Sequence, residues 1–354
     1  MLKSILRSLT KQKFPLFIMS VIIKLLNYLI PKSNQIMFAS SPDFSDNTKA
    51  LYDYITSRKN VDYRLLWSVD EPREEIDVPQ YKNFSLGKLW QFLRSKYIVT
   101  SHGAPSARVK NQVLINVWHG MPLKAMGYAD NKDKDDIVLP FNFDDENYYF
   151  IATSVIMKNA LAACFNQDPG RIFITGQPRN DKLFKGCREK VLKMLGVDPG
   201  KYEKIVLFAP TFRKPHIWDD GRLISYKFNL PDFDLTRFQE FLMEHGIFCF
   251  VKFHQFEEKM AIEHFRGAEN IKLIKTQTLQ DNIIDIYDIL GCVDVLVTDY
   301  SSVYFDFLLL DKPIIFIVPD LDEYRKRRGF ILEPFEFWAP GPRVETFSDF
   351  LKEL

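Results

Sequence analysis

The chain has 354 residues, which is too long for one ordinary domain and suits two. Apolar residues make up 46% of it and charged residues 26%, a balance typical of a folded globular protein and not of a disordered one. The formal net charge is +1, and neither zinc-finger spacing nor a helix-turn-helix pattern is present, so nothing in the sequence indicates a nucleic-acid partner.

The first 32 residues are basic and apolar. The first acidic residue is Asp43, and the basic residues before it are Lys3, Arg7, Lys11, Lys13, Lys24 and Lys32. The apolar run from Phe14 to Ile30 contains Lys24 and falls short of the ~20 mostly apolar residues that span a membrane comfortably. We therefore predict that residues 1–32 form a basic amphipathic segment on an anionic membrane surface, where each basic residue contributes about 1 kcal/mol. An ordinary helix packed on the domain is the alternative.

Residues 33–198 alternate short apolar runs with helical stretches. The runs are apolar throughout, which predicts strands buried on both faces. The predicted strands are 36–40, 63–69, 97–101, 113–118, 149–154 and 172–176. The acidic stretch 130–149 interrupts this order and predicts a solvated loop or insertion.

A polar, glycine-containing region at 196–204 separates this half from a second series in residues 199–354. Here the predicted strands are 205–211, 247–254, 271–274, 294–299 and 313–318, and the predicted helices include 235–245 and 302–310. The fold class that follows is α/β, with two doubly wound, Rossmann-like lobes after the basic segment. Sheets of this kind bind ligands beyond the carboxyl ends of their strands.

Two histidines follow predicted strands, one in each lobe. His119 comes after 113–118 and precedes Gly120, where the chain must turn, and His254 ends 247–254. A lone histidine at a strand end is more often structural, but two that face one crevice favour a chemical role. An imidazole with a pKa of about 6.5 can accept a hydroxyl proton or, once protonated, stabilise phosphate charge.

Polar residues follow other predicted strands. Ser301 and Ser302 open a predicted helix and suit a phosphate, although a plain capped helix is the alternative. Asp306, about one turn further on, could accept a hydrogen bond from a hydroxyl. Arg179 could hold a diphosphate bidentately or pair with Asp181 at the surface.

Other motifs are weak or absent. Pro210 and Thr211 follow a strand and could line a pocket for a base or ribose. No metal-ligand spacing connects the remaining histidines, which are His102, His216, His245 and His264. No phosphate-binding P-loop motif occurs, so ATP-driven chemistry loses support. The cysteines are far apart and are predicted to be reduced, mostly buried residues of a cytosolic protein: Cys164, Cys187, Cys249 and Cys292.

Five blocks of sequence together resemble one family. They are WHGMPLK (118–124), GQPRND (176–181), APTFR (209–213), VKFH (251–254) and the long run 294–330. In the last block a strand, a serine pair, an aromatic-acidic helix, D-K-P and R-G-F occur in order. The sequence is similar to the CDP-glycerol glycerophosphotransferase family of teichoic acid and capsule synthesis, over roughly residues 95–335, and most similar to its glycerophosphate primases.

The resemblance implies a glycosyltransferase-B-like enzyme in which residues 33–198 form the acceptor-side lobe and residues 199–354 bind the donor. Members transfer glycerol phosphate, or ribitol phosphate in some relatives, from a CDP-activated donor to a hydroxyl of a lipid-linked acceptor and release CMP. We expect this enzyme at the cytoplasmic face of the cell membrane, bound peripherally. We expect no metal or other cofactor, because protein cations already face the diphosphate.

The resemblance also assigns residues. The two essential histidines of the family match His119 and His254, and one of them is the expected general base. The family's donor contacts match Gly120, Met121, Pro122, Leu123, Arg179, Pro210, Thr211, Lys252, Phe253, Ser301, Ser302 and Asp306. Met121 stands where the family commonly has threonine, which removes a hydroxyl from the loop.

We expect a primase that adds the first glycerol phosphate to an undecaprenyl-diphosphate-linked disaccharide, because the chain has about the size of the primases. A glycerol or ribitol phosphate polymerase, a nucleotide-sugar glycosyltransferase and a glycan-binding module without activity are the alternatives. The oligomeric state stays open.

Overall fold

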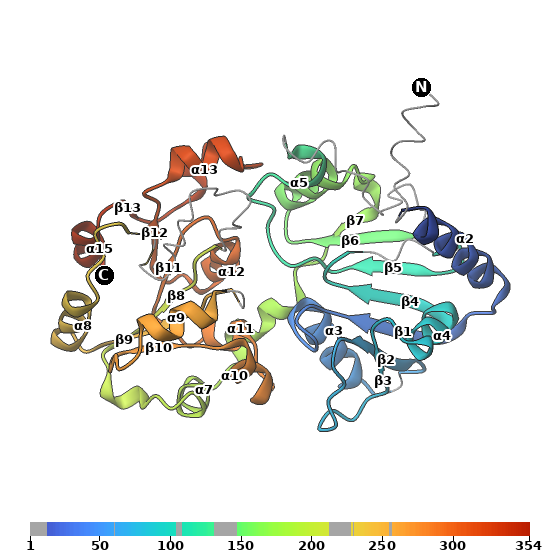
Figure 1. Cartoon of the computed structure of the whole chain (residues 1–354), viewed down its shortest axis with the longest axis horizontal. Coiled ribbons are helices and arrows are strands. Elements are labelled where there is room, and N and C mark those ends of the chain that lie inside the picture. The colour runs from blue at the N-terminus through green and yellow to red at the C-terminus, as the bar shows by residue number, and fades with distance from the viewer. Residues whose placement is uncertain are drawn as a thin grey trace. The chain divides into compact units, whose positions relative to one another are not determined.

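The computed structural model describes residues 13–59, 61–103, 108–130, 147–211, 228, 230–254 and 257–354. Contacts divide the chain into two compact units (Figure 1). Unit 1 consists of Met1–His119 and Asp135–Pro178, and unit 2 consists of Gly120–Lys134 and Arg179–Leu354. The expected α/β class with two doubly wound sheets is confirmed, and each unit contains one sheet.

Unit 1 has, in its described part, a sheet of seven parallel strands in the order β3-β2-β1-β4-β5-β6-β7 (Figure 1). Phe38 of β1 lies between Trp67 of β2 and Val99 of β4, and all three side chains are buried. Burial of both faces explains the unbroken apolar runs of these strands. The strands are β1 (Ser33–Ala39), β2 (Arg64–Val69), β3 (Gln80–Lys82), β4 (Ser95–Thr100), β5 (Val113–Asn116), β6 (Tyr148–Ala152) and β7 (Ile172–Ile174).

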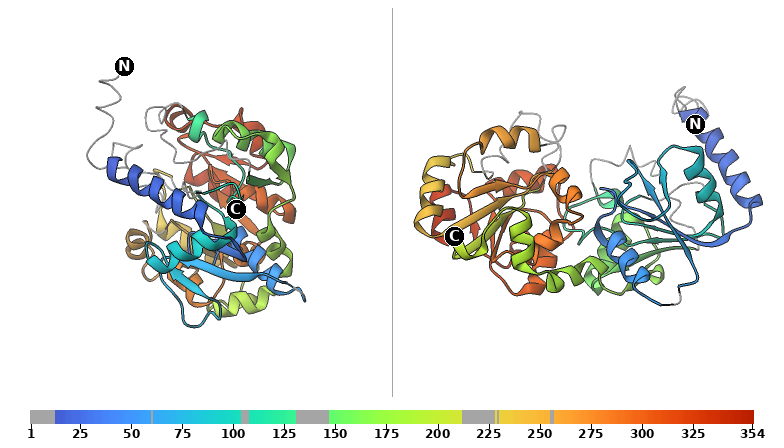
Figure 2. Two further views of the ribbon diagram at one scale, coloured as in Figure 1. Left: turned by 90° about the vertical axis from the view of Figure 1, so that its right-hand side faces the viewer. Right: turned by 90° about the horizontal axis from the view of Figure 1, so that it is seen from below.

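The helices of unit 1 lie on both sides of this sheet (Figure 2). They are α2 (Lys13–Leu29), α3 (Asp46–Thr56), α4 (Leu86–Arg94), α5 (Val155–Phe165) and the 3-10 turn η3 (Pro169–Arg171). Serine side chains cap two of them: Ser85 accepts from the N–H of Lys88, and Ser154 accepts from that of Met157. These bonds satisfy backbone donors at the helix starts and fix where α4 and α5 begin.

Unit 2 has, among the described residues, a sheet of six parallel strands in the order β10-β9-β8-β11-β12-β13. Its core on one side is aromatic: Phe228 stacks on Phe208 with ring centroids 4.1 Å apart and also contacts Phe238 and Phe350. The strands are β8 (Lys204–Phe208), β9 (Ile247–Val251), β10 (Ile271–Leu273), β11 (Val295–Thr298), β12 (Ile314–Ile317) and β13 (Arg343–Val344).

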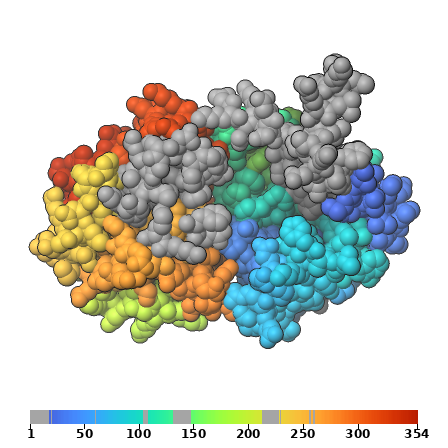
Figure 3. Space-filling view, in the orientation of Figure 1, coloured from blue at the N-terminus to red at the C-terminus, as the bar shows by residue number. Residues whose placement is uncertain are grey.

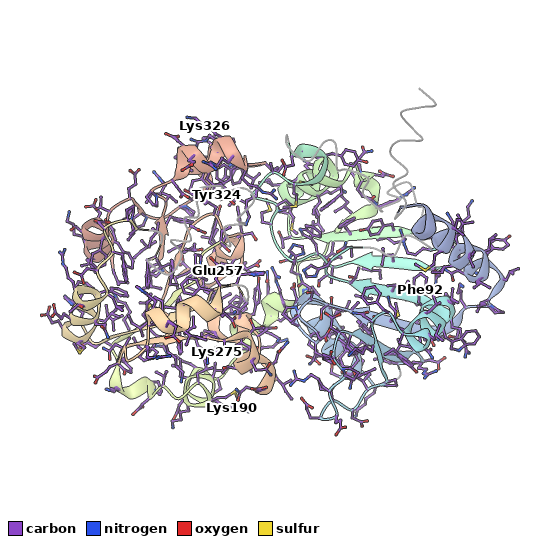
Figure 4. All side chains as sticks on the ribbon, in the orientation of Figure 1. Phe92, Lys190, Glu257, Lys275, Tyr324 and Lys326 are labelled. Atoms are coloured by element: carbon purple, nitrogen blue, oxygen red, sulfur yellow. The ribbon has the colours of Figure 1, made fainter. Side chains whose placement is uncertain are left out.

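Short helices connect these strands. They are α6 (Lys182–Lys185), α7 (Arg188–Met194), α8 (Leu235–Glu244), α9 (Glu258–His264), α10 (Thr276–Asp281), α11 (Ile286–Leu290), α12 (Val303–Phe307), α13 (Leu321–Arg327), α14 (Phe335–Trp338) and α15 (Phe347–Glu353). The 3-10 turns are η1 (Gly127–Ala129), η4 (Pro178–Asp181), η5 (Pro199–Lys201) and η7 (Leu308–Leu310). In α13, Tyr324 points inward and packs on Tyr300 at 4.1 Å, whereas Lys326 points to solvent (Figure 4).

The strands end earlier than the sequence predicted. The predicted strands 113–118, 205–211 and 247–254 stop at Asn116, Phe208 and Val251. The first residue after each of these strands still donates a backbone hydrogen bond to the neighbouring strand, and regular pairing stops beyond it. The predicted helix 302–310 is likewise split into α12 and the turn η7. The edge strands β3 and β13 were not predicted, since two or three residues are too few for a periodic pattern.

All four cysteines are free, and Cys164, Cys249 and Cys292 are buried. Cys187 is exposed, contrary to a core position, because it lies just before α7 at the surface. Most of the acidic stretch 130–149 lies outside the described residues.

The division of the chain differs from the expected boundary at 198/199, because α6 and α7 belong to unit 2. Lys182 of α6 pairs with Asp285 at 2.7 Å, and Arg188 of α7 binds both carboxylate oxygens of Asp294, at 2.5 and 2.7 Å. A bidentate pair of this kind is geometrically specific. These contacts attach the segment after Pro178 to the second sheet.

Most of the large apolar side chains that the structure describes in helix α2, at residues 18, 19 and 21–29, are exposed. Leu25 is 62% exposed and Leu29 is 74% exposed, and the exposed set also includes Ile18, Met19, Val21, Ile22, Leu26 and Tyr28. Figure 3 shows this helix at the surface, in dark blue. Within the described part of the chain, no helix has both the length and the apolar character needed to cross a membrane. Residues 1–12 of the basic segment lie outside the described residues.

One polar cluster anchors the end of α2. Asn27 is completely buried and donates to Gln112 at 2.6 Å, and Gln112 in turn donates to the carbonyls of Phe92 and Ser95. Lys32 donates to the side chain of Asn27 at 2.6 Å, and burial lowers the pKa of this lysine. Hydrogen bonds therefore attach the helix at its carboxyl end.

Candidate active site

Each sheet has one point where the order of its strands reverses direction. In unit 1 the chain leaves β1 on one side for β2 and β3 and returns on the other for β4, so the reversal lies between β1 and β4. In unit 2 it lies between β8 and β11. Loops diverge at such points and leave room for a ligand at the carboxyl ends of the strands. The residues that follow β4, β8 and β11 are therefore placed for function by the topology alone.

In unit 1, His119 follows a turn that is fixed by two buried asparagines. The side-chain amide of Asn47 donates to the carbonyls of Val117 and Trp118, at 3.1 and 2.8 Å. The side-chain oxygen of Asn116 accepts from the N–H of Trp118 at 2.9 Å. Trp118 has a left-handed φ of 47°, which is unfavourable for an aromatic residue, so these bonds stabilise a strained turn.

The ring of His119 is half-buried and held on three sides. Its Nδ1 lies 2.8 Å from the carbonyl oxygen of Ser101, and because a carbonyl can only accept, Nδ1 must carry a proton. The rings of Trp118 and His102 pack against it, with centroid distances of 4.1 and 4.5 Å. In the neutral ring the proton-accepting nitrogen is therefore Nε2, which is the form a general base needs.

His102 was considered in the sequence only as a possible metal ligand, and its place beside His119 was missed. The signal was present, since His102 comes two residues after β4, and β4 borders the reversal point of its sheet. The order of strands that gives this position meaning is not visible in the sequence.

In unit 2, the loop Gly120–Leu123 pairs with the chain near Phe330. The carbonyl of Leu123 accepts from the N–H of Ile331 at 2.8 Å, and Lys124 forms an antiparallel bridge with Phe330. The loop is buried at Met121, Pro122 and Leu123. The side chain of Leu123 is part of the core, so what this loop can present to a ligand is mainly its backbone.

Gly120 is close to two residues that were predicted to bind the donor substrate. Its φ is 146°, and a Cβ atom at this position would lie 2.8 Å from Oγ of Ser302 and 3.5 Å from Nη2 of Arg179. Any side chain here would clash with the serine hydroxyl and strain the backbone. Glycine is therefore required for this backbone to approach Ser302 and Arg179.

Arg179 and Asp306 form a buried ion pair at 2.8 Å, and each residue is only 4% exposed. Asn180 donates to the other oxygen of Asp306 at 3.1 Å. Tyr287 donates its hydroxyl to Asp306 at 2.6 Å, and its ring lies 4.3 Å from the guanidinium carbon of Arg179. The carboxylate of Asp306 thus accepts from three hydrogen-bond donors. One of them is a hydroxyl, as the sequence suggested, but it belongs to Tyr287, which was not predicted for the site.

The surface alternative for Arg179 is wrong. Asp181 pairs with Lys185 at 2.9 Å instead, and both of those side chains are exposed. Arg179 was placed in the site by its position before a helix. Asn180 stands beside it in the GQPRND block but was given no role, and Tyr287 lies outside the five blocks.

The helix that positions Tyr287 is itself attached by charge. Lys182 donates to Asp285 at 2.7 Å and to Asp288 at 3.3 Å. Burial alone would lower the pKa of Lys182, but the two carboxylates outweigh it and the net shift is upward. Burial and the charge of Asp285 raise the pKa of Asp288. The segment that carries Arg179 and the helix α11 are therefore tied together twice.

The carboxyl ends of β8 and β11 are linked directly. Asp299 is completely buried, and its carboxylate accepts from the backbone N–H of Thr211 at 2.8 Å. Pro210 lies beside this contact in sequence and is partly exposed. Ser301 and Ser302 are also partly exposed, and Ser302 is at the N-cap position of α12 without a side-chain capping bond. The alternative of a plain capping serine is therefore not seen at Ser302.

After β9, the three predicted residues differ in character. Lys252 donates to Glu258 at 2.7 Å and to Thr276 at 3.1 Å, and burial lowers the pKa of Lys252 against the effect of Glu258. Phe253 is 2% exposed and belongs to the hydrophobic core. His254 is exposed. Of the three, His254 is the side chain that solvent or a ligand can reach most readily.

No group of three or more histidine, cysteine, aspartate or glutamate side chains suited to a metal ion occurs among the described residues. Two carboxylates of unit 2, Asp299 and Asp306, contact residues that were predicted to bind the donor substrate. Both accept hydrogen bonds from N–H or O–H groups of the protein. The observed donors around Asp306 compensate its charge without an ion.

The cluster around Asp306 predicts different outcomes for two buried tyrosines. Tyr287→Phe should lower the free energy of unfolding by about 1.5–3 kcal/mol, because a buried carboxylate loses a hydrogen-bond donor. Tyr304→Phe is the matched control, since Tyr304 is also fully buried but its hydroxyl has no hydrogen-bond partner among the described residues. Its removal should leave stability unchanged or raise it. Urea unfolding of both variants measures the difference, and equal losses would contradict this account.

Known proteins match the chain in sequence and in fold. The family described as CDP-Glycerol:Poly(glycerophosphate) glycerophosphotransferase matches residues 22–354. The chain is 32% identical to the teichoic acid poly(glycerol phosphate) polymerase of Bacillus spizizenii, covering 95% of this chain and 87% of that protein. It is 30% identical to the teichoic acid glycerol-phosphate transferase of Staphylococcus aureus, covering 94% and 86%. By contrast, it spans 44% of the length of the corresponding Bacillus subtilis polymerase.

Further relatives include a teichoic acid glycerol-phosphate primase of Bacillus subtilis, 26% identical, which the chain covers to 82%, and a poly(ribitol-phosphate) polymerase of Bacillus spizizenii, 30% identical, covered to 50%. The solved structure of the wall teichoic acid polymerase TagF has the same fold, with a TM-score of 0.78 and 24% identity over all of this chain and 88% of that one. The chain therefore belongs to the CDP-glycerol:poly(glycerophosphate) glycerophosphotransferase family and is a transferase of that family.

Proposed function

We propose that this chain transfers glycerol phosphate from CDP-glycerol to a hydroxyl of a lipid-linked acceptor and releases CMP. The hydroxyl oxygen attacks the phosphorus that carries the glycerol, the bond from this phosphorus to the bridging oxygen breaks, and CMP leaves with that oxygen. The hydroxyl proton passes to Nε2 of His119. Phosphoryl transfer needs alignment and charge stabilisation more than covalent help from the protein.

The observation that supports this proposal most is the state of His119. The Ser101 carbonyl keeps its proton on Nδ1, so the neutral ring is a base at Nε2. His119 is bonded directly to Gly120, and Gly120 is in near contact with Ser302 and Arg179. The base is thus joined by one peptide bond to a loop that lies against a hydroxyl and a guanidinium.

The remaining residues bind the donor in this proposal. Arg179, the hydroxyls of Ser301 and Ser302, and the exposed His254 hold the diphosphate and stabilise the charge on departing CMP. The backbones of the Gly120–Leu123 loop, of Pro210–Thr211 and of Lys252–Phe253 line the nucleotide. The side chains of Leu123 and Phe253 contribute to the core and not to contacts, because both are buried there. No metal is needed in this mechanism, since protein cations and hydroxyls face the phosphates.

The number of units added is a separate matter. The expectation of a primase rested on chain length, but a relative that this chain covers to 87% of its length is named a polymerase. Length therefore does not separate the two activities. We retain transfer to an undecaprenyl-diphosphate-linked disaccharide as the first reaction, and the products decide whether further units follow.

The exposed face of α2 supports a place at the cytoplasmic face of the membrane. A helix with exposed leucine, isoleucine and valine side chains and an exposed Lys24 fits the boundary between headgroups and acyl chains of an anionic leaflet. The acceptor is expected in the same membrane, so binding there would bring enzyme and acceptor together.

Incubation with CDP-glycerol, CDP-ribitol or a nucleotide sugar, each with a short-chain lipid-diphosphate disaccharide, tests the reaction by mass spectrometry. We expect a gain of glycerol phosphate with release of CMP, and the same rate in excess chelator. One added unit identifies a primase and a ladder identifies a polymerase. Transfer from the nucleotide sugar alone, or from none of the donors, would contradict the proposal. Activity that returns only with added Mg²⁺ would contradict the metal-free mechanism.

Histidine variants test the assigned roles. His119→Asn should reduce turnover by about 10²–10⁴-fold, the usual effect of losing a general base. His254→Asn should reduce it by about 10²–10³-fold, as when one charge-stabilising donor is lost. His245→Asn is the control, because His245 lies on the exposed end of α8. Near-normal turnover in either site variant, with His245→Asn also normal, removes that histidine from the mechanism.

Vesicle binding tests the role of α2. The double variant Leu25→Glu/Leu29→Glu should reduce binding to vesicles with anionic lipid at least about tenfold, because burial of each leucine contributes about 1.5–3 kcal/mol. Phe337→Glu is the matched control, since Phe337 is 73% exposed on α14. Cosedimentation measures both. Equal binding of the double variant and the wild type, or an equal loss in both variants, would show that α2 is not the membrane contact.

A further inference from the structure

We propose that His102 positions His119 for proton transfer by stacking on its ring. This inference rests on the proposed role of His119 as general base, and it assigns a function to a histidine outside the motifs that match the family. The two rings are nearly parallel, with an interplanar angle of 13° and centroids 4.5 Å apart. His102 is a positioning residue in this account, because it acts on His119 and not on the substrate.

The ring of His102 is itself fixed. Its Nδ1 lies 2.8 Å from the hydroxyl of Ser101, and its backbone N–H donates to the hydroxyl of Thr100 at 3.2 Å. Its carbonyl accepts from the side-chain amide of Asn116 at 3.0 Å. One hydrogen bond thus holds the ring of His102 and two hold its backbone, just after the end of β4.

Ser101 links the two histidines. Its carbonyl accepts the Nδ1 proton of His119, and its hydroxyl contacts Nδ1 of His102. A displacement of either ring therefore acts on the same residue. Since the tautomer of a histidine is set by the partner of its other nitrogen, the contact with the Ser101 carbonyl determines that Nε2 is the base.

Stacking adds a restraint that the hydrogen bond lacks. Rotation about the Cβ–Cγ bond of His119 would carry its ring out of its plane and into the rings of Trp118 and His102, which pack against it. The bond to Ser101 fixes one nitrogen, and the two flat neighbours fix the plane of the ring. Nε2 then points in one direction, which matters because a misplacement of about 1 Å can cost ~10²-fold in rate.

Three variants of His102 separate stacking from hydrogen bonding. His102→Phe keeps a flat ring and loses the contact with the Ser101 hydroxyl. His102→Asn can keep a polar atom near the position of Nδ1 and loses the ring, and His102→Ala loses both. If the stack positions His119, kcat for transfer from CDP-glycerol falls about tenfold or more in the Asn and Ala variants and is largely retained in the Phe variant, with KM for CDP-glycerol unchanged in all three.

Wild-type kcat in His102→Ala would overturn the inference, and so would a loss in His102→Phe as large as in His102→Ala. The matched control is His245→Asn. His245 also stacks on a neighbour, Phe241, at 4.2 Å, and its Nδ1 also lies 2.9 Å from a carbonyl, that of Phe241. Loss of this second stacked histidine should leave kcat and KM unchanged.

A spectroscopic measurement separates this inference from the proposed function. With ¹⁵N-labelled histidine, the ring-nitrogen shifts of His119 should show the Nδ1-protonated tautomer in the wild type and in His102→Phe, and a mixture of tautomers in His102→Ala. An unchanged tautomer in His102→Ala would overturn the positioning role. If the wild type is inactive with every CDP-polyol but the tautomer still depends on residue 102, the proposed function fails and the positioning role stands.

Discussion

Parallel pairing of strands is the constraint that governs both units. Parallel strands must be connected by crossovers, so helices cover both faces of each sheet and the strands themselves become apolar. A polar side chain within a buried strand needs internal hydrogen bonds, as Gln35 of β1 has, so the strand ends are where polar groups can face a ligand. At the carboxyl ends lie His102 and His119 in unit 1, and Thr211, His254 and Ser302 in unit 2. The residues proposed for the site lie there because helices cover both faces of each sheet elsewhere.

Within unit 2, the buried pair of Arg179 and Asp306 illustrates how such an edge is stabilised. Removing two charges from water is costly, and a buried ion pair is favourable only when further hydrogen bonds satisfy its atoms. Here Tyr287 and Asn180 donate to the same carboxylate, and the tyrosine ring also packs against the guanidinium. The arrangement fixes the direction of the guanidinium. In the proposed mechanism, Arg179 therefore has its final orientation before the CDP-activated donor binds. A surface arginine would have to lose conformational entropy first.

The sequence was sufficient for the features that depend on neighbouring residues. Apolar runs predicted the long strands, and the segments that follow them include His119, Arg179 and Ser302. The sequence was insufficient where the position of a residue depends on the order of strands or on a partner far away in the chain. Tyr287 reaches Asp306 from a helix that only the fold brings close, and β13 pairs through two residues. Phe253 was assigned from its neighbours in a motif, but its side chain points into the core. The motifs name residue types at given positions, whereas the direction of each side chain required the structure.

The hydrogen bonds at the end of α2 connect two distant parts of unit 1. Gln112 joins Asn27 of α2 to the carbonyl of Ser95, the first residue of β4, and His102 follows the opposite end of that strand. The strand Ser95–Thr100 is six residues long, which corresponds to roughly 20 Å. The carboxyl end of α2 is thereby held at a set distance from His102. The strand works as a spacer, and its length sets how far the attachment of α2 lies from His102 within this unit.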